Sequence, residues 1–215
     1  MSRVLQVNIA VPEATRVKGP GMTGINKQPV SHPVEVRAVG PKGTLPPEGA
    51  SGVAGDRIYD LANHGGTDQA VYAYAREDYD WWEKELDREL TSGLYGENLT
   101  TEGADLGEAV LGETWRIGDT LVLQTTSGRV PCATFQEKMG EPRWVKRFAQ
   151  EGRPGDIIRV VTPGPVQAGD RIEVLDRPAH GVEAVGACGD VLLVDQVLPD
   201  RDVQQAVGQR EVGVG

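Results

Sequence analysis

Thr120-Leu-Val-Leu-Gln-Thr-Thr-Ser-Gly-Arg-Val-Pro-Cys132 is the stretch that says most about the fold and chemistry of this chain. Its apolar first half, Thr120 to Thr125, predicts a strand. Pro131 has a fixed φ and no amide N–H, so a stiff turn is predicted at the strand end. Arg129 lies three residues before Cys132, and a nearby cation lowers the pKa of a thiol from a free value of roughly 8.5. The turn therefore holds either a reactive thiolate or a cysteine that packs as a small hydrophobe.

Short strands separated by close turns account for most of the chain. The sequence contains 28 Gly and 14 Pro, which favours many turns. In Val4–Ile9 the apolar Leu5, Val7 and Ile9 alternate with polar residues, which is the period of a half-buried strand. Further extended segments are predicted at Val34–Val39, Gln69–Tyr74, Gly96–Thr100, Ile157–Val161 and Arg171–Leu175, with two strands inside Glu113–Thr125. This pattern predicts a mostly β fold, either a barrel or a sandwich.

Two helices interrupt the strands. In Arg76–Leu90 the residues Tyr79, Trp82, Leu86 and Leu90 are spaced three or four apart, which predicts an amphipathic helix. Pro142–Gly152 has proline in its first turn and glycine at its end, which predicts a short helix.

Two loops and an appendage complete the predicted organisation. Pro12–Pro33 predicts a long loop with a short element near Thr23–Lys27. Pro41–Gly52 predicts a second loop that is either mobile or lid-like. Beyond Asp176 the periodicity weakens, so residues 1–176 are predicted to form one domain and residues 177–215 an appendage, diverged or partly disordered. Asp56 in Gly55-Asp56 is predicted to be structural, because Gly-Asp recurs where turns are expected: Gly118-Asp119, Gly155-Asp156 and Gly169-Asp170.

Composition restricts the possible partners and the compartment. The 215 residues fit one domain, or one domain plus an appendage, and allow a proper core. A net charge of −10 and a pI near 4.8 disfavour binding to nucleic acid or to an anionic membrane surface. No apolar run is long enough to span a membrane, and no secretory leader is visible, so a cytoplasmic protein is expected. Cys132 and Cys188 are expected to be free thiols, with one disulfide as the alternative.

Five short motifs occur in a characteristic order. They are Thr23-Gly-Ile-Asn-Lys-Gln-Pro-Val30, Gly55-Asp-Arg57, His64-Gly-Gly66 with Ala70-Val-Tyr-Ala-Tyr74, Gly96-Glu-Asn-Leu99, and Arg129-Val-Pro-Cys132. Together they resemble the MOSC domain, the molybdenum cofactor sulfurase C-terminal domain family, in its stand-alone YiiM-like branch, over about residues 3–175. The resemblance implies a closed, mostly β barrel-like fold with a few short helices and a C-terminal appendage.

The resemblance also implies a cofactor. MOSC domains bind the molybdenum cofactor, a molybdopterin dithiolene with a phosphate, and the cysteine of the last motif ligates the metal. The residue types agree, because thiolate is a soft ligand and a phosphate is bound by cations and backbone N–H groups. Cys132 is therefore the predicted metal ligand and, with His64 and Glu97, a predicted catalytic residue. The predicted cofactor-binding residues are Lys27, Arg57, His64, Gly65, Gly66, Asn98 and Arg129.

For three of these residues the sequence allows more than one role. His64 donates a hydrogen bond to cofactor or substrate, or it satisfies loop carbonyls. Glu97 and Asn98 hold the pterin edge or move a proton, and an ordinary turn role fits Asn98 equally well.

The function implied by the resemblance is reduction of N-hydroxylated or N-oxide compounds, such as hydroxylamino nucleobases and amidoximes. Electrons would come from a separate reductase, because the chain shows no flavin, haem or iron–sulfur motif, and a homodimer is one possible assembly. The family is also associated with pyridoxal phosphate binding. Two alternatives are a sulfur carrier or cofactor-handling protein, with a persulfide or the cofactor on Cys132, and a ligand-binding β domain without turnover.

The chain departs from the family pattern in three places. Gly128 stands where the family usually has the proline of Gln-Pro-Arg, which predicts a less rigid turn. Gly155-Asp-Ile-Ile-Arg-Val160 lacks the aromatic residues expected beside the pocket. Ala179–Gly215 matches the usual three-helix tail poorly.

Overall fold

The centre of the protein is an eight-stranded sheet. The structure is a computed structural model that describes residues 1–17, 21–104 and 106–184. The strand order is β12-β8-β9-β10-β6-β7-β1-β4, and neighbours are antiparallel except for the parallel pair β6 and β7. The strands are β1 (Arg3–Ala10), β4 (Lys27–Val30), β6 (Val71–Ala75), β7 (Leu99–Glu102), β8 (Thr114–Ile117), β9 (Leu121–Gly128), β10 (Asp156–Thr162) and β12 (Ile172–Asp176).

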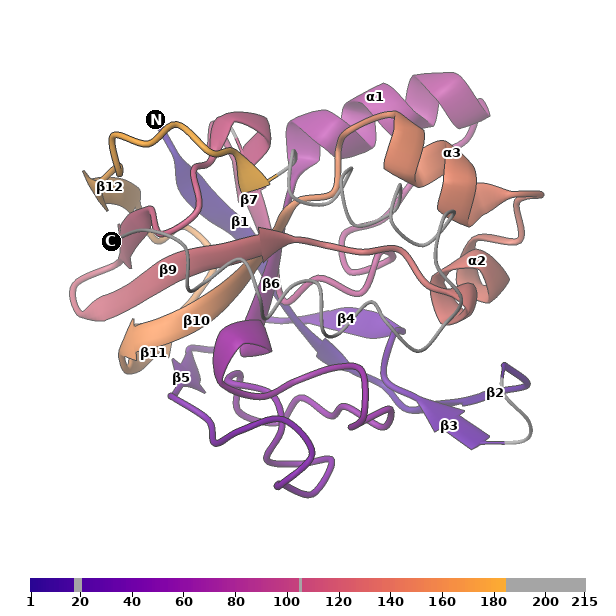
Figure 1. Cartoon of the computed structure of the whole chain (residues 1–215), viewed down its shortest axis with the longest axis horizontal. Coiled ribbons are helices and arrows are strands. Elements are labelled where there is room, and N and C mark those ends of the chain that lie inside the picture. The colour runs from indigo at the N-terminus through magenta and orange to yellow at the C-terminus, as the bar shows by residue number, and fades with distance from the viewer. Residues whose placement is uncertain (18–20, 105, 185–215) are drawn as a thin grey trace.

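Small sheets and helices surround this sheet. The hairpin of β2 (Glu13–Thr15) and β3 (Gly21–Thr23) is one small sheet, and β5 (Val34–Val36) pairs with β11 (Gly164–Val166) in another. Figure 1 shows the three α-helices together at one end of the large sheet. The helical elements are α1 (Arg76–Leu86), α2 (Ala133–Met139) and α3 (Trp144–Gln150), with 3-10 turns η1 (Thr67–Gln69) and η2 (Leu106–Glu108). Across the residues described, no helix is long and apolar enough to cross a membrane.

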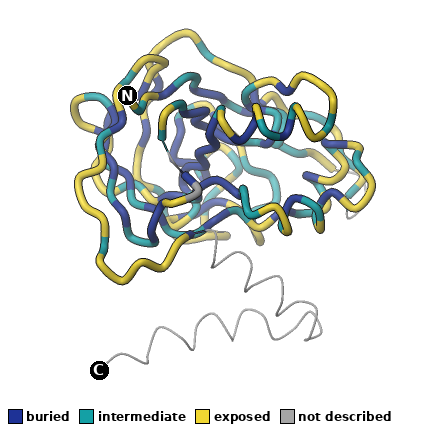
Figure 2. Tube along the Cα trace, turned by 90° about the horizontal axis from the view of Figure 1, so that it is seen from above, coloured by how far each residue is buried: buried dark blue, intermediate teal, exposed yellow. Residues whose placement is uncertain are grey.

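The interior is divided into an aliphatic and an aromatic core. The aliphatic core joins the large sheet to the β5–β11 pair and includes Val36, Leu99 and Leu123. The aromatic core lies where the helices meet β6, and Trp82 and Trp144 are fully buried in it. In Figure 2 the buried segments accordingly run through the middle of the molecule. Burial of these apolar side chains is the main stabilising contribution to the fold.

The prediction of a mostly β fold with a few helices is confirmed. The closed barrel stays a prediction, because the large sheet has two end strands, β12 and β4. Main-chain hydrogen bonds do connect the start of β1 with the start of β12: Ile172 N–H donates to Ser2 O at 2.9 Å, and Val4 N–H donates to Asp170 O at 2.8 Å.

The predicted parity of the first strand is wrong. A register shift interrupts the pairing of β1 with β7 between Val4 and Gln6. The extra residue of such a bulge breaks strict alternation, so Val4, Val7 and Asn8 are fully buried while Leu5 is only half-buried.

The first segment predicted as a loop contains strands. Pro12–Pro33 holds β2, β3 and β4, and β4 includes Pro29, which a strand at a sheet end tolerates. The strand predicted at Val34–Val39 ends at Val36, where β5 pairs with β11, a strand that forms although it contains Pro165. Glycine and proline therefore did not mark loops correctly where a strand pairs with a neighbour on one side only.

The helices also differ at their boundaries. α1 ends at Leu86, because Asp87 adopts a left-handed φ of 49° and its N–H bonds back to Glu83 O. α3 is confirmed but shorter than predicted, and α2, which follows the cysteine turn, was not predicted. The spacing of Phe135, Met139 and Gly140 was the available signal for α2, since both apolar residues are buried and the glycine caps the helix at φ 67°.

The boundary predicted at Asp176 stays a prediction. Residues 177–184 lie against the large domain, and Ala184 is fully buried. The remainder of the predicted appendage, including Cys188, is outside the described residues.

Candidate functional site

A cavity of about 420 Å³ lies between the β2–β3 hairpin, the 56–65 loop, β6 and the turn after β9. Its volume is typical of a pocket for a small molecule or cofactor. Seven of the nine residues predicted from the sequence line it: Lys27, Arg57, His64, Gly65, Asn98, Arg129 and Cys132. Residues from five separate motifs are thus brought to one cavity, whereas Glu97 and Gly66 are absent from its wall.

Cys132 carries a free, half-buried thiol at the cavity wall. It has extended backbone and precedes the first residue of α2. Burial raises its pKa, but the interactions with the His64 side chain, the Arg129 charge and the Phe135 backbone N–H outweigh burial and lower the pKa to about 6. A thiol with that pKa is mostly thiolate at neutral pH, which is the form that binds metals and attacks electrophiles.

Arg129 is fixed beside the cysteine turn. Its Nη1 donates to Tyr95 O at 2.6 Å, and its guanidinium carbon lies 3.8 Å from the centroid of the Phe135 ring. The same group lies 5.2 Å from the Tyr72 ring. Arginine commonly stacks on aromatic faces in this way. Its position on the aromatic core therefore holds a positive charge close to Cys132.

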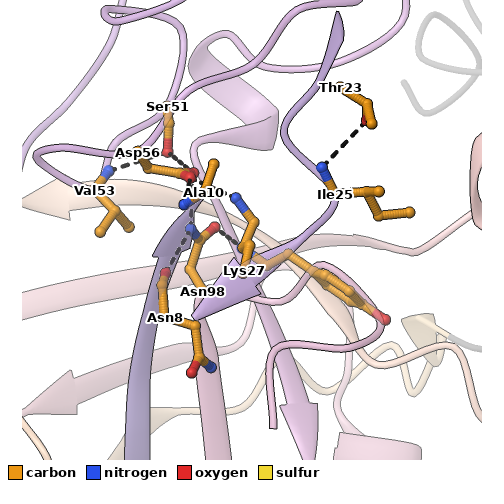
Figure 3. Close-up of polar contacts among 10 residues, drawn as sticks. Asn8, Ala10, Thr23, Ile25, Lys27, Ser51, Val53, Asp56 and Asn98 are labelled. Atoms are coloured by element: carbon orange, nitrogen blue, oxygen red, sulfur yellow. Dashed lines mark hydrogen bonds and ion pairs between the residues drawn. The ribbon is translucent and has the colours of Figure 1, made fainter. Parts of the chain in front are cut away.

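Asp56 is the centre of a buried polar network in the cavity wall (Figure 3). Its Oδ1 accepts from Lys27 Nζ at 2.6 Å and Ala10 N–H at 2.8 Å. Its Oδ2 accepts from Ser51 Oγ and Asn98 Nδ2, both at 2.8 Å. Burial raises the pKa of Asp56, but the charge and hydrogen bond of Lys27 and the other two side-chain donors outweigh it, so the pKa is lowered. Asp56 therefore remains a carboxylate.

The network joins several parts of the cavity wall. Lys27 begins β4, Ala10 ends β1, and Asn98 precedes β7. The Asn98 amide oxygen also accepts from Tyr72 N–H at 3.2 Å, which extends the network to β6. An ammonium has three donors, and within the described residues Lys27 uses one of them, on Asp56. Lys27 is therefore charge-balanced by Asp56 and can still donate to a ligand.

The His64 loop depends on its two glycines. Gly65 and Gly66 have φ values of +79° and +88°, a region that favours glycine. A Cβ on Gly65 would also lie 2.8 Å from Ala50 O, and one on Gly66 would lie 2.6 Å from Lys42 N. The loop thus brings His64 to the cavity by packing its backbone against residues near 42 and 50. Gly66 has this structural position and does not reach the cavity.

Arg57 and Glu97 lie in opposite surroundings. The Arg57 side chain is 46% exposed, and its nearest carboxylate, Glu48, is 3.7 Å away. Glu97 is fully buried, where it accepts from Tyr79 Oη at 2.9 Å and Thr100 Oγ1 at 2.8 Å. Burial raises the pKa of Glu97. Arg57 is therefore well placed for an anionic ligand, and Glu97 holds the turn that precedes β7.

Several cavity residues were missed from the sequence. Met22 and Val130 are 46% and 42% exposed and line the cavity, as does Tyr59. Met22 was missed because the β2–β3 hairpin was predicted as a loop. Asp56 was predicted to be structural, and its network confirms that role while also placing it in the cavity wall.

Within the described residues, the cavity of this mostly β protein contains one thiol, Cys132, together with cationic side chains from separate motifs. This combination suits a soft metal ion or nucleophilic chemistry. The MOSC domain family model matches residues 60–173, which is more than half of the chain. The chain belongs to the MOSC domain family, and the prediction of a YiiM-like MOSC protein is confirmed.

Three relatives illustrate the range of the family. The uncharacterised protein YflK of Bacillus subtilis is 33% identical over 180 residues, covering 83% of this chain and 76% of YflK. A protein of Gibberella moniliformis named reductase is 35% identical over 132 residues, covering 60% of this chain but 23% of that protein. Protein YiiM of Escherichia coli is 29% identical over 129 residues, covering 59% of this chain and 57% of YiiM.

A solved structure supports the fold. YiiM from Geobacillus stearothermophilus aligns with a TM-score of 0.69 and 22% identity, covering 98% of this chain and 99% of that one. At this identity the comparison shows a common fold.

Proposed function

We propose that this protein binds a molybdenum cofactor in the cavity, with Cys132 as the protein ligand to the metal. We further propose that it reduces N-hydroxylated compounds or N-oxides with electrons from a partner reductase. The observation that carries the proposal is the thiol of Cys132, whose pKa of about 6 makes it a thiolate at the cavity wall. Family membership and the relative named reductase support the same chemistry.

The residues present fit such a cofactor. Within the described residues no group of three or more His, Cys, Asp or Glu side chains is placed to hold a metal ion. A metal that brings its own dithiolene sulfurs needs few ligands from the protein, and a thiolate is the type that suits it. Arg57 offers a solvent-exposed guanidinium for a phosphate. Asn98 and Lys27 line the wall and offer polar groups, and Gly65 lies beside them in the wall.

The bound cofactor would supply the two-electron redox chemistry that this reduction needs. In the net reaction the N-hydroxyl group takes up two electrons and two protons, so the N–O bond breaks, an N–H bond forms and the oxygen leaves as water. The protein itself holds Cys132 as a thiolate through His64 and Arg129. The Lys27–Asp56 pair provides a hydrogen-bond donor whose charge is already balanced.

Pyridoxal phosphate fits the cavity less well. That cofactor forms a Schiff base with a lysine amine. Along the described cavity wall the lysine is Lys27, whose ammonium lies 2.6 Å from the Asp56 carboxylate. The Lys27 nitrogen is thus engaged with the Asp56 carboxylate and is not free to form a Schiff base.

Metal and pterin analysis tests the cofactor proposal. The protein is purified from a host that makes the cofactor, beside Cys132→Ser and, as a matched control at the other cysteine, Cys188→Ser. Wild type and Cys188→Ser should each contain molybdenum and pterin near one per chain, whereas Cys132→Ser should lose most of the metal. Wild-type protein without molybdenum would contradict the proposal, and cyanide-labile sulfur on Cys132 would favour the sulfur carrier.

Turnover tests the reaction separately. Loaded protein is supplied with a reduced viologen as electron donor and a hydroxylamino purine or an amidoxime as acceptor. Loss of the N-hydroxyl group, detected by chromatography, should require both molybdenum and Cys132. A loaded protein that leaves both compounds unchanged would support a cofactor-handling role instead.

A further inference from the structure

Residues 177–184, which we call the brace, follow β12 and lie along the segment before β8. Leu111 N–H donates to Val182 O at 2.9 Å, and Ala184 N–H donates to Ala109 O at 2.9 Å. An antiparallel bridge joins Val110 and Glu183 between these bonds. The brace is therefore bonded to the domain like a short added strand.

An ion pair fastens the first residue of the brace. Arg177 Nε lies 2.7 Å from Glu113 Oε2, and the Glu113 side chain is 2% exposed. Glu113 also accepts from Trp115 Nε1 at 2.7 Å, and its backbone carbonyl accepts from Thr125 N–H at 2.9 Å. The Arg177 side chain is 47% exposed, so only the Glu113 side of the pair is buried. Removing Arg177 would leave the buried Glu113 carboxylate without this counter-charge, which is unfavourable. Arg177 thus ties the brace to Glu113, the residue that precedes β8 and whose carbonyl is bonded to Thr125 of β9.

The last residue of the brace rests on Gly128, the final residue of β9. A Cβ on Gly128 would lie 2.8 Å from Ala184 O and 3.0 Å from Pro154 Cγ. Pro154 O in turn accepts from Tyr72 Oη at 2.8 Å. Gly128 is thus held between Ala184 on one side and Pro154 on the other, four residues before Cys132.

We infer that the brace positions the turn that carries Cys132, with Arg177 and Ala184 as the positioning residues. The family usually has a proline where Gly128 stands, and the ring would fix the backbone from within. Neither a ring nor a β-carbon fits between Ala184 and Pro154. In this chain the turn is held from outside, by a segment that is bonded to residues 109–113 and rests against Gly128 at the end of β9. This role is independent of whether Cys132 binds molybdenum or carries sulfur.

Hydrogen exchange and thiol alkylation at fixed pH test the brace in the full-length protein. The variants are Arg177→Gln, Arg177→Lys and Gly128→Ala. The matched control is Arg116→Gln, which breaks the exposed Arg116–Glu173 pair between β8 and β12, 2.6 Å long. In Arg177→Gln, amide exchange in a peptide covering residues 128–136 and the rate of Cys132 alkylation should each rise about fivefold, through easier local opening. Arg177→Lys should restore most of the protection, and Arg116→Gln should match wild type.

Two results would overturn the inference. One is wild-type exchange and alkylation in a folded Arg177→Gln protein. The other is an equal rise in exchange in a peptide covering residues 3–10, which would mean that Arg177 stabilises the whole domain without a local role at the turn. Gly128→Ala should show the same local change as Arg177→Gln; if it does not fold, the two Arg177 variants decide the question.

Discussion

Two buried aspartates of this protein follow a glycine and have opposite surroundings. Asp56 is 1% exposed in the cavity wall, and Asp156 is 0% exposed at the start of β10. Asp56 accepts four hydrogen bonds, one of them from an ammonium. Both carboxylate oxygens of Asp156 lack any hydrogen-bond partner within the described residues. The same Gly-Asp dipeptide therefore gives a stabilised anion in one place and an unpartnered acid in the other.

The pKa values of the two aspartates are shifted in opposite directions, in line with their hydrogen bonding. The pKa of Asp56 is lowered although burial alone would raise it, because Lys27 and the hydrogen-bond donors favour the charged form. The pKa of Asp156 is raised well above its ordinary value, first by burial and then by the negative charges of Glu113 and Asp78. A buried carboxyl without partners keeps its proton. Fixed charge is thus placed at the cavity, and the sheet interior beside Asp156 is kept neutral.

Lys27→Met should lower the free energy of unfolding more than the other variants proposed here, because it turns Asp56 into a buried carboxylate without a counter-charge. The Lys27 and Asp56 side chains are 7% and 1% exposed. Breaking one side of such a pair costs about 3–5 kcal/mol. Urea unfolding at neutral pH should show this loss in the free energy of unfolding.

Lys138→Met is the matched control for that variant. Lys138 pairs with Glu13 at 3.1 Å, with side chains 17% and 35% exposed, and neither residue lines the cavity. Because solvent screens this pair, the expected cost is about 1 kcal/mol or less. Equal losses in Lys27→Met and Lys138→Met would contradict the claim that Asp56 depends on its buried partner.

The double variant Lys27→Met with Asp56→Asn should recover about 2 kcal/mol relative to Lys27→Met, because both charges are then removed together. A double-mutant cycle from urea unfolding measures this coupling. A coupling energy close to zero would mean that the ion pair does not stabilise the cavity wall. The claim that Asp56, unlike Asp156, is stabilised by a buried counter-charge would then be wrong.

The sequence predicted which residues line the cavity better than it predicted the hydrogen bonds and ion pairs between them. Cys132, Arg129 and His64 were identified from local motifs, and each lies on the cavity wall because turns and strand ends bring these motifs together. The difference between Asp56 and Asp156 was not predictable, because it depends on Lys27, Ser51 and Asn98 meeting from distant parts of the chain. Long-range pairing also decided the strands. β4 and β11 form because partners lie beside them, despite Pro29 and the prolines around Gly164.

Asp156→Asn should change how stability depends on pH. The pKa of Asp156 in the folded protein lies above its ordinary value of 3.8, so the stabilising contribution is complete below the pKa of the unfolded chain and is lost as the pH rises towards the folded pKa. In that window the free energy of unfolding should fall by about 1.4 kcal/mol per pH unit for this group. The variant should lack that fall and be the more stable protein at neutral pH.

Urea unfolding of wild type and Asp156→Asn between about pH 4 and 8 measures this difference. Asp56→Asn serves as the comparison of opposite sign, because the pKa of Asp56 is lowered and its stabilisation is lost as the pH falls. Parallel stability curves for wild type and Asp156→Asn would show that Asp156 is ionised in the folded protein, and the contrast between the two aspartates would fail.

Ser51→Ala should have the smallest effect, because it removes one of the four donors to Asp56 and leaves the ion pair intact. Ser51 Oγ donates to Asp56 Oδ2 at 2.8 Å, and Asn98 still donates to the same oxygen. Losing one hydrogen bond to a charged group costs about 1–2 kcal/mol, measurable by urea unfolding. Thr44→Val, which removes an exposed hydrogen bond to Pro41 O, should cost less. If Ser51→Ala and Thr44→Val have equal effects, the Asp56 carboxylate relies on Lys27 alone, and its full set of hydrogen bonds is not what distinguishes it from Asp156.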